Sequence, residues 1–286
     1  MTGPPSKEGL PADMAEADFG RLDAAQFPVF SPGTVWLVGA GPGAAGLLTL
    51  IGYHALINAD VVIYDALVGK QILDWARPDA EIEYAGKRGG KPSANQGDIS
   101  LRLIALARAG KRVLRLKGGD PFIFGRGGEE GQMLARAGVP FRIVPGISAG
   151  VGGLAYAGIP ATHRDINHSV MFLTGHDSTG EVPAGVDWRA VAQATPVLVI
   201  YMAVKNLKMI ADRLTAHGRP AEDPVTIVAR ATLPEQEVVE MTLGDILEMD
   251  STEHLPTPSV VVVGRASALR PLLDWYSESL RENPIG

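Results

Sequence analysis

The sequence contains no cysteine. Disulfide bonds, thiolate metal sites and cysteine nucleophiles are therefore excluded. The composition suits a reducing compartment, and we expect a cytoplasmic protein. The first thirty residues also lack the apolar core of a signal peptide, so residues 1–30 are predicted to form a flexible lead-in.

Long runs of large hydrophobic residues are missing from one stretch that carries no charge. The segment from Ile143 to Thr162 contains five glycines and two prolines. A bilayer-spanning helix needs about 20 predominantly apolar residues, whereas this segment is rich in small ones. We therefore expect no membrane span here and interpret the segment as a tightly packed helix or loop.

Charge is unevenly distributed along the chain, although the overall composition, 46% hydrophobic and 20% charged, is ordinary for a globular protein. The net charge is −6, yet the segment from Ala85 to Arg126 carries ten lysines and arginines against Asp98 and Asp120, a local charge of +8. Such a basic zone on an acidic protein predicts an anionic partner. The overall acidity, and the lack of aromatic residues between the basic ones, argue against nucleic acid.

Strands and helices alternate, which predicts an α/β fold with a mostly parallel sheet. Apolar runs of strand type occur at 35–38, 61–64, 81–84, 113–116, 141–144, 169–173, 197–201, 225–229, 237–241 and 260–263. Helical spacing occurs at 47–58, 99–109, 129–137, 188–193 and 207–217. The strand at 237–241 follows its predecessor closely, so we expect an antiparallel pair and a mixed second sheet. We predict an N-terminal α/β domain at 31–146, a glycine-rich linker region at 147–165 and a C-terminal α/β domain at 166–280.

The first glycine loop follows the strand at 35–38. Gly41, Gly43 and Gly46 satisfy the pattern G-x-G-x-x-G, and Asp65 lies 19 residues after Gly46, at the end of the next strand. This layout is typical of dinucleotide-binding proteins, in which the acid binds a ribose hydroxyl. An NAD-binding oxidoreductase is therefore one hypothesis, although Pro42 lacks the N–H that a pyrophosphate-binding loop would use. A tight turn without a ligand is the alternative.

A second glycine cluster follows the strand at 113–116 and runs from Lys117 to Gly128. Glycine turns at the carboxyl ends of two strands are expected to line one crevice, where open α/β sheets bind ligands. S-adenosylmethionine (SAM) suits such a crevice, because it combines an adenosine with a zwitterionic amino-acid end and carries no phosphate. In this hypothesis Asp120 accepts from the ammonium or a hydroxyl group, and Ile123 and Met202 pack on the adenine.

These motifs resemble those of the uroporphyrinogen-III C-methyltransferases, within the wider tetrapyrrole methylase family. The matching runs are residues 39–43, 47–50, 65–68, 86–89, 113–130, 145–149, 158–164 and 173–176. The resemblance extends from about Val35 to Trp275, and the run from Lys117 to Gly128 is its most specific part. The chain departs from the family pattern at Ala44-Ala45, where many relatives have Asp-Pro, and at Ser148, where threonine is common.

The resemblance implies two α/β domains with an active-site cleft between them, usually in a homodimer. It implies methylation of uroporphyrinogen III, an anionic tetrapyrrole, at two pyrrole carbons to give precorrin-2, a precursor of sirohaem and cobalamin. The methyl donor would be SAM and the product S-adenosylhomocysteine (SAH). Residues at matching positions that would contact SAM are Pro42, Gly118, Gly119, Asp120, Ile123, Ser148, Ala149, Met202 and Ala231. The acid/base residues implied are Asp65 and Lys87.

A pyrrole carbon is electron-rich, so this reaction requires no nucleophilic side chain. A carboxylate such as Asp65 would stabilise the positive charge of the methylated macrocycle or accept a proton, unless it is only a strand-end cap or a ribose contact. Arginine is the natural ligand for substrate carboxylates, because its planar fork binds them with two hydrogen bonds. The arginines proposed for this task are, in order of preference, Arg88 and Arg126, then Arg115 and Arg164. Arg115 has an alternative position on a solvated sheet edge.

Other hypotheses remain open at this point. The chain could methylate a later precorrin, or it could be a non-catalytic regulatory protein that binds an anionic metabolite through the basic zone. No metal is expected, because the spacing of His163, His168 and His176 fits no closed metal site.

Overall fold

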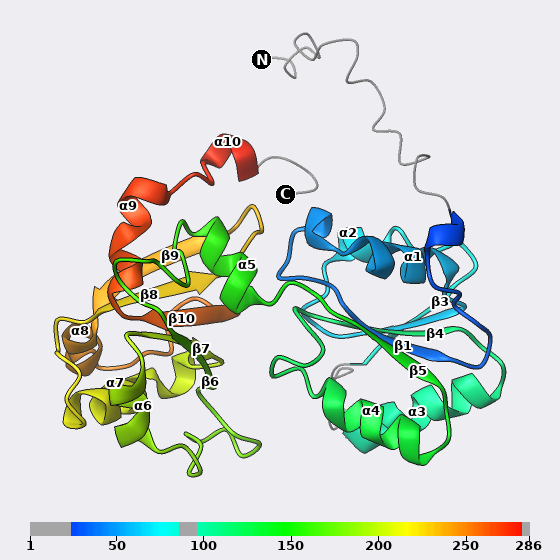
Figure 1. Ribbon diagram of the computed structural model, residues 1–286, viewed down its shortest axis with the longest axis horizontal. Helices are drawn as coiled ribbons and strands as arrows, with labels where there is room; N and C mark the ends of the chain where they lie inside the picture. The colour runs from blue at the N-terminus through cyan, green and yellow to red at the C-terminus, as the bar shows by residue number, and fades with distance from the viewer. Residues whose placement is uncertain (1–23, 86–95, 282–286) are drawn as a thin grey trace, which may run out of the picture.

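The computed structural model describes residues 24–85 and 96–281. Two five-stranded sheets organise these residues, one in each half of the chain (Figure 1). The strands of the first sheet are β1 (Val35–Gly39), β2 (Val61–Tyr64), β3 (Glu81–Tyr84), β4 (Val113–Lys117) and β5 (Phe141–Val144). Those of the second sheet are β6 (Val170–Thr174), β7 (Val197–Tyr201), β8 (Pro224–Ala229), β9 (Glu237–Thr242) and β10 (Ser259–Val263). Each predicted strand is therefore a strand in the structure.

Helices connect the strands. They are α1 (Leu50–Asn58), α2 (Lys70–Leu73), α3 (Gln96–Arg108), α4 (Gly127–Arg136), α5 (Ala149–Tyr156), α6 (Trp188–Ala194), α7 (Leu207–Ala216), α8 (Leu243–Glu248), α9 (Arg270–Leu273) and α10 (Glu278–Arg281). Short 3-10 turns are η3 (Ala24–Gln26), η4 (Ala45–Leu47), η5 (Val204–Asn206) and η6 (Arg265–Leu269). The five predicted helices correspond to α1, α3, α4, α6 and α7.

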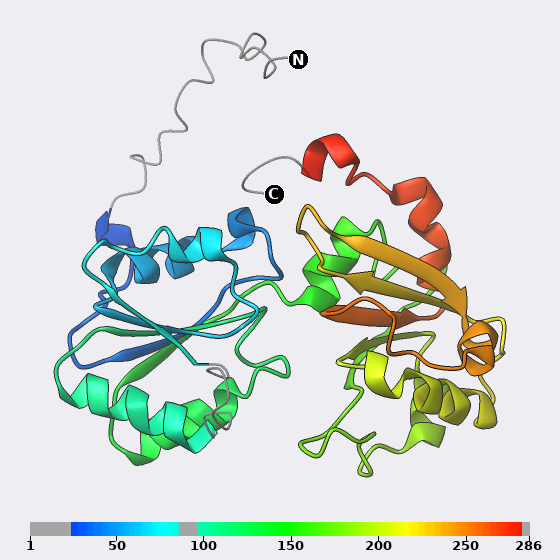
Figure 2. The same cartoon turned by 180° about the vertical axis from the view of Figure 1, so that it is seen from behind.

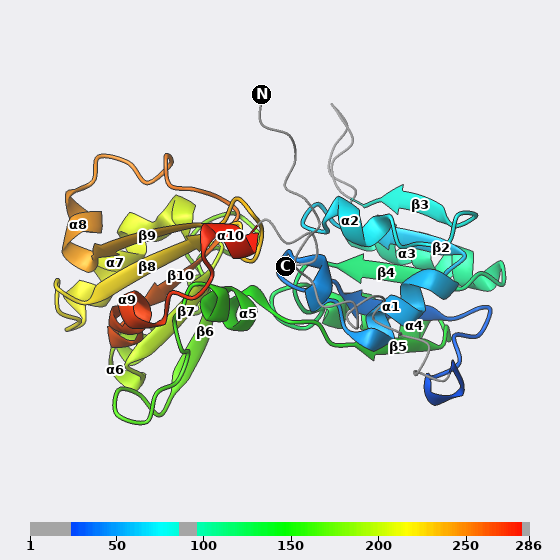
Figure 3. The same ribbon diagram turned by 90° about the horizontal axis from the view of Figure 1, so that it is seen from above.

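The first sheet is parallel throughout, in the order β3-β2-β4-β1-β5. Parallel neighbours need crossover connections, and helices supply them here. Helices α1 and α2 cover one face of the sheet, and α3 and α4 cover the other (Figures 1 and 3). Because both faces are covered, β1 and β4 are buried along their whole length. The α/β prediction is confirmed for this half.

The strand order differs from that of the dinucleotide-binding fold. In that fold the first strand lies between the second and the fourth, in the order 3-2-1-4-5-6. Here β4 lies between β2 and β1 and is the central strand of the sheet. The second glycine turn, which follows β4, therefore occupies the middle of the carboxyl edge, with the ends of β2 and β1 on either side.

The second sheet is mixed, in the order β6-β7-β10-β8-β9. Strands β6 and β7 run parallel, and β8 pairs antiparallel with β9, as predicted. Helices α6, α7 and α8 pack on one face, and α5 packs on the other through the buried residues Leu154 and Ala157. The glycine-rich region at 147–165 thus contributes a helix to the core of the second half. Figure 2 shows α5, in green, where the two halves meet.

Local capping explains where two helices begin. The helix predicted to start at Leu47 starts at Leu50, because Thr49 Oγ1 accepts a hydrogen bond from Gly52 N (3.0 Å) and caps the helix there. Helix α8 was not predicted, although a capping box at Thr242 initiates it. The capping signal is visible in the sequence, but the helix is too short to show helical spacing.

The final part of the predicted lead-in is packed against the first sheet. The ring of Phe27 stacks on His54 with centroids 4.8 Å apart, and the ring of Phe30 stacks on Trp36 with centroids 4.5 Å apart. These residues of the predicted lead-in therefore have aromatic contacts with the first half of the chain. The rest of the predicted lead-in, residues 1–23, lies outside the described residues.

Candidate active site

Three glycines bring the ends of β1, β4 and β5 together. A Cβ atom on Gly39 would lie 2.5 Å from the carbonyl oxygen of Gly119 and 2.5 Å from Cα of Gly146. A Cβ atom on Gly146 would lie 2.2 Å from the same oxygen, and Gly119 has φ = +65°, which other residues rarely adopt. The backbones of three strand ends therefore pack with no side chain between them, and the two glycine turns lie side by side.

The first glycine loop uses two of its backbone amides within the protein. Gly41 and Gly119 exchange two hydrogen bonds, with N···O distances of 3.2 and 2.7 Å. Ala44 donates its N–H to Oγ1 of Thr232 in the second half of the chain (2.8 Å). A dinucleotide-binding loop would instead present such groups to a pyrophosphate at the start of a helix. Together with the strand order, these contacts remove the basis for the NAD hypothesis.

The same loop docks directly onto the second half of the chain. A Cβ atom on Gly43 would lie 2.7 Å from the carbonyl oxygen of Ala231, and a Cβ atom on Gly152 would lie 3.1 Å from Cγ of Pro42. The loop therefore has no room for larger side chains where it meets the second half. We call the meeting place of these loops the domain junction, which comprises residues 39–44, 118–124, 146–150, 201–202 and 231–232.

Tyr201, the last residue of β7, ties the second sheet to the start of α5. Its hydroxyl accepts a hydrogen bond from Gly150 N (2.8 Å) and shares one with Ser148 Oγ (2.6 Å). Its ring lies 5.1 Å from the ring of Phe124, between centroids. Burial raises the pKa of Tyr201, so the hydroxyl stays protonated at neutral pH. Met202 follows with φ = +54° and is 41% exposed.

The residues predicted to contact SAM lie on the loops of the domain junction. They are Pro42, Gly118, Gly119, Asp120, Ile123, Ser148, Ala149, Met202 and Ala231. They come from both halves of the chain and from five separate segments, so the structure brings together what the sequence separates. Their contact with SAM stays a prediction.

Asp120 is bound to the backbone on both sides of its carboxylate. Oδ1 accepts from Phe122 N (2.7 Å) and Oδ2 accepts from Gly146 N (2.9 Å). The first bond closes the turn after β4, and the second joins this turn to the end of β5. The sequence predicted only a ligand contact for Asp120, and the structure adds this role in holding the loop. Each carboxylate oxygen has a second lone pair, and the side chain is half-buried, so a ligand donor can still reach it.

Four charged side chains form a closed group next to the second glycine turn, which we call the charge quartet: Asp65, Arg115, Lys117 and Glu130. Arg115 pairs with Asp65 and donates through Nε to Glu130 Oε1 (3.0 Å). Lys117 Nζ lies 3.3 Å from the same Glu130 oxygen and 3.6 Å from Asp65 Oδ2. The side chain of Asp65 is 32% exposed, whereas the other three are almost fully buried. Burial, reinforced by the charge of Arg115, lowers the pKa of Lys117.

The quartet corrects the prediction made for Arg115. The predicted alternative position of Arg115 on a solvated sheet edge is wrong, because β4 is the central strand of its sheet. The Arg115 guanidinium also donates to the carbonyl oxygens of Ile63 (3.4 Å) and Leu116 (3.3 Å) and is 2% exposed. Protein acceptors enclose it on several sides, so we no longer assign a substrate contact to Arg115.

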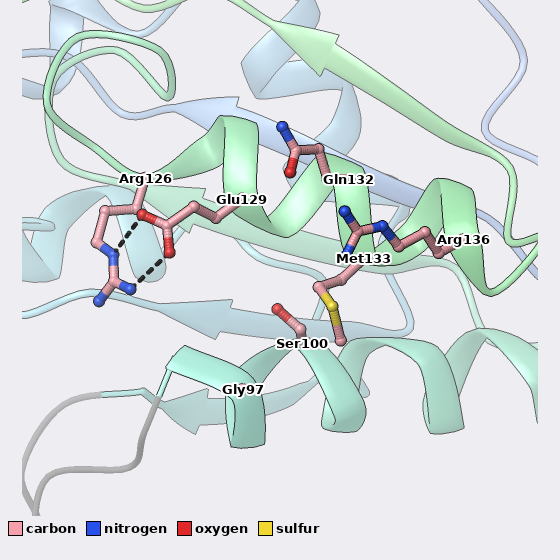
Figure 4. A pocket seen from close by; sticks show the side chains of 7 residues that line it. All are labelled: Gly97, Ser100, Arg126, Glu129, Gln132, Met133 and Arg136. Carbon is pink, nitrogen blue, oxygen red and sulfur yellow. Dashed lines mark hydrogen bonds and ion pairs between the residues drawn. The ribbon is translucent and has the colours of Figure 1, made fainter.

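The remaining predicted arginines lie at the surface or outside the described residues. Arg126, with φ = +59°, precedes α4 and forms two hydrogen bonds to Glu129 (2.9 and 2.6 Å). Figure 4 shows it at one end of a pocket between α3 and α4. Other residues that line this pocket are Gly97, Ser100, Gln132, Met133 and Arg136. Arg164 is exposed between α5 and β6. Lys87 and Arg88 lie outside the described residues.

Sequence analysis did not single out three residues that shape this site. Tyr201 was visible only as the end of a strand, Thr232 as part of a loop, and Glu130 as an acid on an amphipathic helix. Their roles depend on partners 13 to 188 residues away, which no local pattern specifies.

Within residues 24–85 and 96–281, no three side chains of His, Cys, Asp or Glu are arranged to hold a metal ion. Over the same ranges, none of the helices has the length and apolar character that crossing a bilayer requires.

Comparison with known proteins gives one consistent family. Residues 34–247 match the family model of the tetrapyrrole (corrin/porphyrin) methylases. A uroporphyrinogen-III C-methyltransferase from Sinorhizobium sp is 57% identical over 251 residues, which are 88% of this chain and 90% of that protein. A siroheme synthase from Neisseria meningitidis serogroup B is 47% identical over 255 residues, which are 89% of this chain and 52% of that protein. The chain therefore spans about half the length of that siroheme synthase.

A solved structure has the same fold. It is a uroporphyrin-III C-methyl transferase from Thermus thermophilus complexed with S-adenyl homocysteine. Its sequence is 38% identical, its TM-score is 0.72, and the alignment covers 82% of this chain and 99% of that chain. The predicted fold class is confirmed by this similarity.

Proposed function

This chain belongs to the tetrapyrrole methylase family, and we propose that it methylates uroporphyrinogen III at two pyrrole carbons, with SAM as the methyl donor, to give precorrin-2. The observation that carries the proposal is the domain junction, where two glycine turns from the first sheet meet the end of β7 and the start of α5. The choice of substrate is supported by the Sinorhizobium uroporphyrinogen-III C-methyltransferase, which matches this chain over 90% of its own length.

The residues of the domain junction fit SAM better than a dinucleotide. The amides of Gly41 and Ala44 in the first glycine loop are already used, which is no loss for a ligand without phosphate. The carboxylate of Asp120 retains lone pairs for an ammonium or hydroxyl group. Met202 and Ile123 offer apolar side chains for an adenine, and the bare backbone at Gly119 allows close approach of a ligand.

The chemistry requires a methyl donor, an acceptor carbon and a base. When bound, SAM supplies a methyl group on a sulfonium. The electron pair of the pyrrole carbon forms the new C–C bond as the C–S bond breaks, and the electron pair of the C–S bond stays on the sulfur of SAH. The protein accelerates such a step chiefly by holding the two reactants in line. Asp65 then stabilises the positive macrocycle and accepts the proton that leaves it, and we keep Lys87 as the second acid/base residue.

Arginine side chains would bind the substrate carboxylates. Arg126 is exposed at the start of α4, close in sequence to the second glycine turn, and its pair with Glu129 is solvated and therefore weak. A substrate carboxylate can replace Glu129 as its partner, with the same bidentate geometry. We retain Arg88 and Arg164 for the same role.

Turnover of anaerobic uroporphyrinogen III with SAM tests this function. We expect each tetrapyrrole to gain two methyl groups and two molecules of SAH to form. Mass spectrometry and absorbance measure the products. A protein that leaves uroporphyrinogen III unchanged but methylates a later precorrin would contradict the proposed substrate while leaving the family assignment intact. A protein that binds the tetrapyrrole and transfers no methyl group would favour the regulatory alternative.

A homodimer is a further proposal, and a cytoplasmic location stays a prediction. Helix α1 presents Leu50, Tyr53 and Ile57 on one face, with exposed fractions of 51%, 44% and 38%. Three large apolar side chains at helical spacing support a contact between two copies. Analytical ultracentrifugation is expected to give twice the chain mass of 30.2 kDa, and Leu50→Glu should lower that value.

A further inference from the structure

The charge quartet contains three buried charges that the proposed chemistry does not use. Arg115 and Lys117 are two positions apart on β4, so both side chains point to the same face of the sheet, the face that α4 covers. Glu130 comes from α4 itself. Asp65 directly follows β2 and is the only member of the quartet with substantial exposure. The turn that Asp65 begins packs against the second glycine turn, because a Cβ atom on Gly118 would lie 2.7 Å from Leu67 Cβ.

We propose that Glu130 and Lys117 are positioning residues that, together with Arg115, hold the carboxylate of Asp65 in one orientation beside the domain junction. The proposal rests on the proposed function, in which Asp65 is the base. Arg115 binds one oxygen of Asp65, and Lys117 Nζ lies 3.6 Å from the other. The carboxylate is thus held from its buried side through both oxygens, and its remaining lone pairs are available on the exposed side.

Glu130 is required because the two cations are close together and out of water. Its Oε1 atom accepts from Arg115 Nε (3.0 Å) and from Lys117 Nζ (3.3 Å), so one oxygen bridges both. Without this bridging carboxylate, the two cations would share the single negative charge of Asp65, and the buried excess of positive charge is costly in a low dielectric. Arginine stays charged under all ordinary conditions, whereas a buried lysine readily loses its proton. Lys117 is therefore the member of the quartet that would become neutral.

A neutral Lys117 would release one oxygen of Asp65. The charged groups that face Lys117 are Arg115 on its own strand, Asp65 at the end of β2, and Glu130 with Glu129 on α4. Burial and Arg115 lower the pKa of Lys117, while Glu130 and Asp65 oppose that shift. Activity is therefore expected to fall on the alkaline side as Lys117 loses its proton, below the ordinary lysine value of about 10.4.

Glu130→Gln tests the proposal, because it keeps the shape of the side chain and removes the charge. We expect the pKa of Lys117 to fall by about one unit or more in this variant. The pKa is measured by 13Cε NMR, and the Lys117 signal is assigned by its loss in Lys117→Arg. The alkaline limb of kcat should move to lower pH by the same amount, while the Kd for SAH in calorimetry stays within about twofold. Lys117→Arg should lose this limb, since arginine stays charged. The matched control is Glu240→Gln, which removes a carboxylate from an exposed pair with Arg270 and should move neither value.

A second measurement separates positioning from general stability. In an Asp65→Asn background, adding Glu130→Gln should cause no further loss of kcat, because Glu130 acts through Asp65. Additive losses, or an unchanged Lys117 pKa in Glu130→Gln, would overturn the proposal. Failure of the wild-type chain to methylate uroporphyrinogen III would instead refute the proposed function, which the NMR titration does not depend on.

Discussion

Ala44 donates its backbone N–H to the hydroxyl of Thr232, 2.8 Å away and 188 residues later in the chain. The bond is buried and joins the first glycine loop to the second half of the protein. The loop whose sequence pattern is typical of phosphate binding therefore forms a contact between the two halves of the chain. The contact joins two of the loops that carry predicted SAM residues, those of Pro42 and Ala231.

Removing the hydroxyl of Thr232 should weaken that contact. Thr232→Val leaves the Ala44 N–H buried without an acceptor, which costs about 1–3 kcal/mol of unfolding free energy. We expect a lower Tm and a weaker Kd for SAH, because the loop no longer docks in one position. Thr232→Ser keeps the hydroxyl and should retain most of both; equal losses in Ser and Val variants would contradict the role of the hydrogen bond.

Glycine is required at Gly146 and dispensable at Gly128. A Cβ atom on Gly146 would collide with the carbonyl oxygen of Gly119 at 2.2 Å, whereas one on Gly128 meets nothing within 4 Å. Gly146→Ala should therefore destabilise the protein strongly or prevent folding. Gly128 lies in α4, so Gly128→Ala should raise stability by about 0.5–1 kcal/mol in urea unfolding. Similar stabilities for the two variants would show that the strand ends are not packed as described.

Asp120 should be needed for SAM binding. Asp120→Ala removes both backbone hydrogen bonds that hold the turn after β4, and it removes the proposed ligand acceptor. We expect at least a tenfold weaker Kd for SAM and SAH by calorimetry, or about 1.4 kcal/mol. Asp120→Asn keeps one acceptor oxygen and should lie between the wild type and Asp120→Ala. Unchanged SAM affinity in Asp120→Ala would refute the location of the site.

Arg126 should contribute to binding of the tetrapyrrole and much less to binding of SAM. Arg126→Ala is expected to weaken substrate binding by at least tenfold, because a charge-assisted bidentate pair is lost. The Kd for SAH should change by less than about twofold. Arg108→Ala, at the exposed end of α3, is the matched control and should affect neither ligand. Equal losses for both ligands in Arg126→Ala would contradict the assignment.

Much of the secondary structure and the family could be predicted from the sequence. Short apolar runs identify strands, and the spacing of apolar residues identifies the longer helices, because both patterns follow from local geometry. The run from Lys117 to Gly128 identified the family without any long-range information. The short helix α8 escaped because its signal is only a cap at Thr242.

Only the tertiary structure decided three features of this protein. They are the position of β4 between β2 and β1, the docking of Ala44 on Thr232 and the burial of Arg115. Arg115 and Lys117 alternate with apolar residues on β4, and such a pattern is typical of a strand with one solvated face. Glu130, which approaches from α4, and Asp65, which follows β2, together neutralise the two cations and make their burial possible. Local sequence determines which faces are polar; only the packing of distant elements determines whether water or a buried countercharge covers them.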